Sequence, residues 1–223
     1  MTEQEVKKYF LFGSIGLGAI IVAGLALAIL SGPDSAERPK GTVEKGLVFN
    51  DDNDPGFGPG ESTFKVRIFS DFQCPACKMA EAAADAARQK YGDRVRFIWN
   101  DFPLPSLHRN ARPAALAARC AEDQGKFWEY HGKLFGQQEE WSPMPAPAST
   151  FQKYAKEIGL DEEVFASCLA DQRFLRKVQD DEAEGERLGV EGTPTFFIGN
   201  KRFVGAMEFA DWEAEIEEML AGS

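Results

Sequence analysis

The alternation of hydrophobic and polar positions predicts an α/β domain that starts near residue 61. Residues 64–69 (Phe-Lys-Val-Arg-Ile-Phe) alternate and then become fully apolar, which is typical of a strand entering a core. An alanine-rich helix follows and stops at Gly92, and residues 95–99 give a second strand. A strand, a helix and a strand in succession favour a parallel pair joined by a right-handed crossover.

A long helical stretch separates this unit from two final strands. Residues 195–198 and 201–204 are short runs on either side of Gly199-Asn200, the pattern of a β-hairpin. A last helix is expected over 208–220. The segment between the two β units is expected to be an all-helical insertion at about 103–188. Helices are predicted at 111–124 and 126–135, and a third runs from a cap at Ser149 to Ile158. A fourth begins after a cap at Asp161, and a longer one ends near Gly189.

One segment has a different pattern from the rest of the chain. Residues 10–30 form a run of 21 positions without a charge, roughly 31 Å long as a helix, which matches the hydrocarbon core of a membrane. A cleaved signal peptide is the alternative, because Ala26-Leu27-Ala28 offers a small-x-small site and Lys7-Lys8 a positive start. The run continues past that site, so we favour an uncleaved transmembrane signal anchor with residues 1–9 in the cytoplasm.

Residues 31–60 read as a flexible linker between this anchor and the domain at 61–223. They contain four Pro and six Gly, with one short strand expected at 47–49. The acidic group at 51–54 lacks the spacing of a calcium loop and is interpreted as turn residues.

Composition and charge exclude several classes of protein. The chain has 223 residues with 43% hydrophobic and 27% charged residues, which excludes a polytopic membrane protein and a wholly disordered chain. Residues 1–40 carry four basic and four acidic side chains, so the whole formal charge of −11 belongs to residues 41–223. An acidic domain without a basic stripe argues against nucleic-acid binding.

The candidate chemistry is at Cys74-Pro75-Ala76-Cys77, where a strand gives way to a helix. Pro75 suits the first helical position, and the N–H groups of a helix start stabilise a thiolate. We therefore expect Cys74, at the exposed helix tip, to be the nucleophile and Cys77, one turn further, to resolve the mixed disulfide. Pro75 and Ala76 are expected to contact the substrate.

A second element of this site is expected about 120 residues later. Pro194 comes just before a strand and is a candidate for a cis peptide bond, which would leave the Thr193 backbone free to pair with an extended substrate. Half of a zinc site is the alternative reading of Cys74 and Cys77. The other cysteines, Cys120 and Cys168, are 48 residues apart and do not form the second close pair that such a site needs.

Cys120 and Cys168 fall in separate expected helices. We interpret them as a structural disulfide that pins the helical insertion, with two reduced core cysteines as the alternative. The two histidines and the four tryptophans are assigned to structure or surface: His108, His131, Trp99, Trp128, Trp141 and Trp212. The acidic run from Asp180 to Glu184 is expected to be a solvated helix face.

With these residues the chain resembles the DsbA-like branch of the thioredoxin superfamily. The matching motifs are FSDFQCPAC at 69–77, DFPL at 101–104 with His108 and Ala111, Cys120-Ala121 with QGKFW at 124–128, and GTPTF at 192–196. The resemblance implies a thioredoxin-like fold, a catalytic pair at Cys74 and Cys77, a cis-proline at Pro194, and a thiol:disulfide oxidoreductase outside the cytoplasmic membrane.

Two departures from that family bear on its redox direction. Strongly oxidising members carry His within the C-x-x-C motif where this chain has Ala76, and their buried acid in the preceding strand falls at Ile68. The direction therefore stays open between an oxidase and a reductant or isomerase.

We expect a membrane-anchored enzyme, periplasmic or at the cell surface, that acts on thiols and disulfides of exported proteins without a metal or organic cofactor. Its expected redox partner is a membrane quinone-linked protein if it is an oxidase, or a thiol donor otherwise. A metallochaperone that binds metal through Cys74 and Cys77 is the alternative from another class.

Overall fold

The computed structural model describes residues 41–50 and 54–222. The predicted N-terminal segment at 1–9 and the anchor at 10–30 lie outside these ranges, so they stay predictions. Within the described part of the chain, no helix has the length and apolar character needed to cross a membrane.

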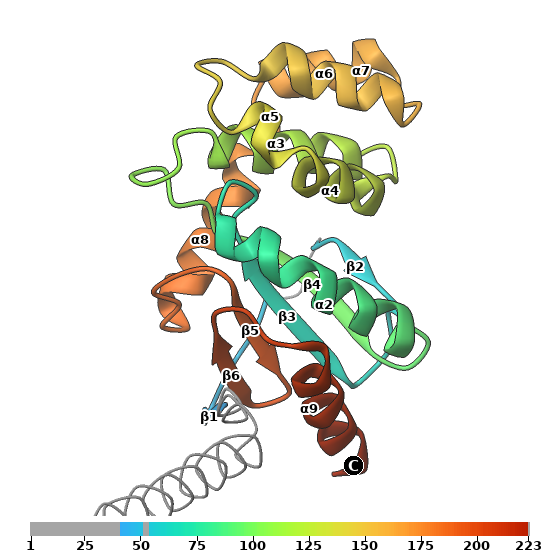
Figure 1. Ribbon diagram of the computed structural model, residues 1–223, viewed down its shortest axis with the longest axis vertical. Coiled ribbons are helices and arrows are strands. Elements are labelled where there is room, and N and C mark those ends of the chain that lie inside the picture. Colours follow the sequence, from blue (N-terminus) through green and yellow to red (C-terminus); the bar gives the residue numbers. More distant parts are fainter. Residues whose placement is uncertain (1–40, 51–53, 223) are drawn as a thin grey trace, which may run out of the picture. The chain divides into compact units, whose positions relative to one another are not determined.

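The domain is built on a six-stranded sheet with the order β1-β6-β5-β3-β4-β2 (Figure 1). The predicted parallel pair is confirmed between β3 and β4, while every other pair of neighbours is antiparallel. The predicted hairpin is β5 and β6. The strands are β1 (Thr42–Val43), β2 (Gly56–Phe57), β3 (Lys65–Ser70), β4 (Arg96–Asp101), β5 (Thr195–Ile198) and β6 (Lys201–Val204).

Helix α2 joins β3 to β4, and α9 closes the domain. All the helices between β4 and β5 belong to the insertion, as predicted, and Figure 1 shows α3 to α7 gathered beyond one end of the sheet. The described helices are α2 (Pro75–Tyr91), α3 (Ala111–Glu122), α4 (Phe127–Gly136), α5 (Gln138–Trp141), α6 (Ala148–Glu157), α7 (Glu162–Ala170), α8 (Leu175–Arg187) and α9 (Phe209–Ala221).

Two helix starts were predicted from capping residues, with different outcomes. The Asp161 side chain accepts hydrogen bonds from the N–H groups of Glu163 and Val164, so this cap is confirmed. The cap at Ser149 is wrong, because α6 begins at Ala148 with Pro147 at its N-cap position, so Ser149 lies inside the helix.

Strand residues alternate between two cores. In β3, Val66 and Ile68 join the main cluster, to which α2 and α9 also contribute. Phe69 and Phe197 point to the other face and pack with Leu188, which follows α8. Because successive strand side chains face opposite ways, the apolar run of β3 covers both faces.

The segment before residue 61 is part of the domain, which corrects the predicted linker boundary. Thr42–Val43 pairs with β6 and Gly56–Phe57 pairs with β4, so both edges of the sheet use this segment to satisfy their backbone groups. Residues 47–49 form no strand. Leu47 and Phe49 instead pack on the second core.

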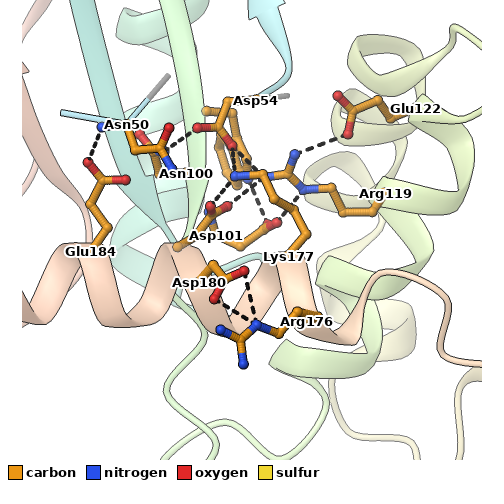
Figure 2. A network of polar contacts seen from close by, with 12 residues as sticks. Asn50, Asp54, Asn100, Asp101, Arg119, Glu122, Arg176, Lys177, Asp180 and Glu184 are labelled. Carbon is orange, nitrogen blue, oxygen red and sulfur yellow. Dashed lines mark hydrogen bonds and ion pairs between the residues drawn. The ribbon is translucent and has the colours of Figure 1, made fainter. Parts of the chain in front are cut away.

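Arg119 in α3 is fully buried and is the centre of an ionic network (Figure 2). Its Nε donates to Asp101 at 2.6 Å, and its Nη2 donates to Asp181 at 2.6 Å and to Asp54 at 3.2 Å. Lys177 in α8 also pairs with Asp181 and Asp54. The network joins the insertion to β4 and to the N-terminal segment of the domain.

This network corrects two expectations about acidic residues. Asp181, predicted to lie on a solvated face, is 1% exposed, and Asp54, predicted to be a turn residue, is 8% exposed. Both carboxylates pair with the fully buried Arg119 and the partly exposed Lys177, and a buried charge requires such a partner.

Candidate active site

Cys74 and Cys77 are both free thiols at the start of α2. Cys74 is the N-cap residue with extended backbone, and Pro75 takes the first helical position, as the sequence indicates. Cys74 is less accessible than predicted, since it is 7% exposed, and Cys77 is deeper at 2%. Pro75 and Ala76, between them, form the more open part of the motif.

The two thiols have opposite protonation tendencies. Hydrogen bonding to the Cys77 side chain lowers the pKa of Cys74 to about 5, helped by the N–H groups of Cys77 and Ala76 and by Thr193, while burial opposes the shift. Burial, and then the neighbouring Cys74 sulfur, raise the pKa of Cys77 far above that of an ordinary thiol. At neutral pH the pair therefore holds one thiolate, on Cys74, and one thiol, on Cys77.

The loop before β5 lies directly against this pair. The Thr193–Pro194 peptide bond is cis, as predicted, and the Cys74 Sγ is 3.5 Å from the Thr193 carbonyl oxygen. The Pro194 carbonyl accepts a hydrogen bond from Gly205 N–H at 2.8 Å, which ties this loop to the end of β6. The structure thus brings together all four predicted catalytic residues, which are up to 120 positions apart.

Two glutamine side chains tie the turn that carries Cys74 to the insertion. Gln138 Nε2 donates to the carbonyls of Phe72 at 2.8 Å and Cys74 at 3.1 Å. Gln73 Nε2 donates to the Ser142 carbonyl at 2.9 Å. Neither glutamine was identified from the sequence, and only the position of Gln73 beside the motif could have pointed to it.

A cavity of about 570 Å³ opens beside Cys74, between the first turns of α2 and the short helix α5. Pro75, Met79 and Pro143 give it an apolar lining, and Lys78 pairs with Glu139 across it at 2.8 Å. Met79 is 71% exposed, so an apolar side chain is available to a partner one turn beyond Cys74.

The two histidines have different surroundings. His131 is buried among aromatic rings, and burial holds its pKa well below the usual range, so it is a neutral core residue as predicted. His108 is 19% exposed and its Nδ1 is 2.8 Å from Asp71 Oδ2. It therefore lies close to the reactive turn in space, although 34 positions separate it from Cys74 in the chain.

The other two cysteines form the predicted disulfide. Cys120 in α3 and Cys168 in α7 are bonded, and each is 1% exposed. Neither is available as a ligand for the Cys74 and Cys77 pair. Among the described residues, no group of three or more His, Cys, Asp or Glu side chains is placed to hold a metal ion.

Comparison with known proteins identifies the class. A family model for thioredoxin matches residues 51–218, and the chain therefore belongs to the thioredoxin family. A thioredoxin-like oxidoreductase from Silicibacter pomeroyi superposes with a TM-score of 0.66 at 25% identity, over 78% of this chain and 95% of that one. BdbD from Bacillus subtilis superposes with a TM-score of 0.69 at 23% identity, over 83% and 100% of the two chains.

A further structural neighbour is the thiol-disulfide exchange protein α-DsbA2 from Wolbachia pipientis, with a TM-score of 0.67 at 24% identity over 76% of this chain and 88% of that one. The neighbours confirm the predicted DsbA-like thioredoxin fold, and the Silicibacter pomeroyi protein supports an oxidoreductase kind of activity. At these identities, BdbD and α-DsbA2 bear on the fold alone.

The curated relatives are larger proteins. A Na⁺/H⁺ antiporter NhaA of Salinispora tropica is 32% identical over 99% of this chain and 34% of its own length. An antiporter NhaA of Mycobacterium sp. strain KMS is 36% identical over 64% of this chain and 23% of its own length. The chain spans about a third or less of these relatives.

Proposed function

We propose that the protein is an extracytoplasmic thiol:disulfide oxidoreductase that forms or exchanges disulfides in exported proteins through Cys74-Pro75-Ala76-Cys77. One observation carries this proposal: Cys74 begins α2, lies beside Cys77, and is 3.5 Å from the Thr193 carbonyl. This arrangement offers a reactive sulfur, a resolving sulfur and an open backbone edge to an extended substrate at one place.

The exchange moves two electrons from a substrate dithiol to the cysteine pair. A substrate thiolate attacks Cys74 Sγ of the oxidised pair, the Cys74–Cys77 bond breaks, and Cys77 leaves and takes a proton. The second substrate thiolate then attacks the substrate sulfur of the mixed disulfide, and Cys74 leaves as a thiolate. The low pKa of Cys74 makes it a good leaving group and stabilises the reduced enzyme, which favours oxidation of substrates.

The enzyme needs a redox partner to complete the cycle. As an oxidase, it would pass two electrons to a disulfide of a membrane quinone-linked protein. As a reductant or isomerase, it would receive them from a thiol donor. Its reduction potential separates these directions, since a value near about −120 mV indicates an oxidant and one near about −270 mV a reductant.

Membrane association is also part of the proposal. The apolar run at 10–30 supports a single anchor, and the antiporter relative from Salinispora tropica aligns over 99% of this chain. The Cys120–Cys168 disulfide supports an oxidising compartment outside the cytoplasm. We therefore place the catalytic domain on the periplasmic or outer side of the membrane.

The decisive experiment is to trap the mixed disulfide. Cys77→Ser should accumulate adducts with disulfide-containing substrates on non-reducing gels, because the Cys74 thiolate attacks the substrate disulfide, one substrate sulfur leaves as a thiolate, and no second cysteine of the enzyme resolves the bond to Cys74. Cys74→Ser is the matched control and should give no adduct. If Cys77→Ser forms no adducts and the wild-type protein binds one equivalent of metal instead, the metallochaperone alternative replaces the proposal.

A further inference from the structure

The turn that carries Cys74 is organised by one buried carboxylate. Asp71 follows β3, three residues before Cys74, and its side chain is fully buried. Asp71 Oδ1 accepts a hydrogen bond from Gln73 N–H at 2.7 Å, and the Asp71 carbonyl accepts one from Cys74 N–H at 3.1 Å. The conformation of this turn, and with it the direction of the Cys74 side chain, depends on how Asp71 is oriented.

The other oxygen of Asp71 is occupied by the loop that follows β4. Asp71 Oδ2 accepts from Leu104 N–H at 3.0 Å and lies 2.8 Å from His108 Nδ1. Among the described residues, His108 is the ionisable side chain that a hydrogen bond or ion pair links to this carboxylate. Without His108, Asp71 Oδ2 keeps the Leu104 N–H but loses its side-chain donor, and a buried carboxylate that loses a hydrogen bond is destabilised, which favours rearrangement of the turn.

We propose that His108 is a positioning residue for the thiol exchange: by donating to Asp71, it fixes the turn that aims Cys74 at Cys77 and Thr193. The inference rests on the proposed function and deepens it. His108 touches neither cysteine in any hydrogen bond of the described residues, so its effect on the chemistry passes through Asp71.

The contacts that stabilise the Cys74 thiolate show what this positioning controls. They come from Cys77, from Ala76 N–H and from Thr193, on two different segments of the chain. Each requires the Cys74 sulfur to sit in one narrow place, because hydrogen bonds weaken steeply with distance and angle. A looser turn would weaken all of them together and destabilise the reduced, thiolate form.

Three variants test this role. His108→Leu removes the donor, while His108→Asn keeps a neutral N–H close to the position of Nδ1. Arg109→Gln is the matched control, because it removes a neighbouring exposed cation that bonds to the Met144 carbonyl and not to Asp71. The readouts are the pH midpoint of Cys74 alkylation by iodoacetamide and the reduction potential, with the melting temperature measured in parallel.

His108→Leu should raise the alkylation midpoint by at least half a pH unit and make the reduction potential more negative. His108→Asn should restore both towards wild type, and Arg109→Gln should change neither. If His108→Leu lowers only the melting temperature, His108 is merely structural and the proposal is wrong. If His108→Leu does not fold, Asp71→Asn takes its place, with the same shift expected and an unchanged midpoint contradicting the proposal.

These readouts are separate from the test of the proposed function. The alkylation midpoint reports on Cys74 without any protein substrate. A shifted midpoint with no mixed disulfides from Cys77→Ser would support the positioning role and reject the exchange activity. Mixed disulfides with an unshifted midpoint would support the exchange activity and reject the positioning role of His108.

Discussion

The two cysteine pairs of this protein differ in their position in the fold and in whether their sulfurs are bonded. Cys74 and Cys77 are three positions apart at the start of one helix, are free thiols, and lie against the loop that carries Thr193. Cys120 and Cys168 come from the interiors of two helices, are 48 residues apart, and are bonded and buried. The comparison teaches that a low thiol pKa follows from the position of a sulfur at a helix start, among hydrogen-bond donors.

The surroundings of the two pairs differ in the same way. The turn that carries Cys74 is held by the buried Asp71 carboxylate and by the amide side chains of Gln73 and Gln138, of which Gln138 comes from the insertion. The bonded pair has the buried Arg119 network next to it in α3, where charges fix the insertion to the sheet.

The largest expected effect comes from removing the reactive sulfur. Cys74→Ser should lower turnover in a dithiol-peptide oxidation assay by on the order of 10³-fold or more, because no covalent intermediate can form. The double variant Cys120→Ala and Cys168→Ala should keep its turnover under conditions where it is folded. Equal losses in the two proteins would remove the functional distinction between the pairs.

The next largest effect is on stability and concerns the bonded pair. Replacing Cys120 and Cys168 by Ala should lower the free energy of unfolding by about 4 kcal/mol, since the disulfide closes a loop of 48 residues in the unfolded chain. Urea unfolding followed by circular dichroism measures this difference. A loss no larger than that of Cys74→Ser would contradict the assignment of this pair as the structural one.

The pH profile of alkylation measures how far the pKa of Cys74 lies below that of an ordinary thiol. With a pKa of about 5, Cys74 should react with iodoacetamide at nearly the same rate at pH 6 and pH 8. For a thiol with an ordinary pKa, the thiolate fraction is roughly 80-fold lower at pH 6 than at pH 8. Mass spectrometry should find the label on Cys74 and none on Cys120 or Cys168, and a rate that keeps rising up to pH 9 would show that Cys74 is not activated.

The smallest effect concerns the ionic network beside the bonded pair. Burial, together with the carboxylates of Asp101 and Asp54, raises the pKa of Asp181 to about 7 against the attraction of Arg119. The folded state then binds this proton more tightly than the unfolded state, so stability falls as the pH rises from about 4 to about 7.

Asp181→Asn should make that fall shallower, because the amide does not titrate over this range. Chemical unfolding at several pH values measures the slope, and the alkylation profile of Cys74 should stay unchanged. An identical slope in Asp181→Asn would place the pH dependence on other members of the network.

Local signals were enough to predict much of the fold and the reactive pair. The alternation in β3, the Gly-Asn turn between β5 and β6, and the Asp161 cap each depend on neighbouring residues, and the structure has all three. The position of Cys74 is also local, because Pro75 and the following alanines define where α2 begins.

Only the tertiary structure decided which distant groups meet. No local pattern pairs Arg119 with Asp54 and Asp181, and an acidic run looks solvated until a buried cation is placed beside it. The short edge strands at 42–43 and 56–57 depend on partners far along the chain, and so does the contact of His108 with Asp71. The sequence by itself determined the elements and the reactive pair, since their causes lie within a few residues, whereas burial and long-range hydrogen bonds exist only once the chain has folded.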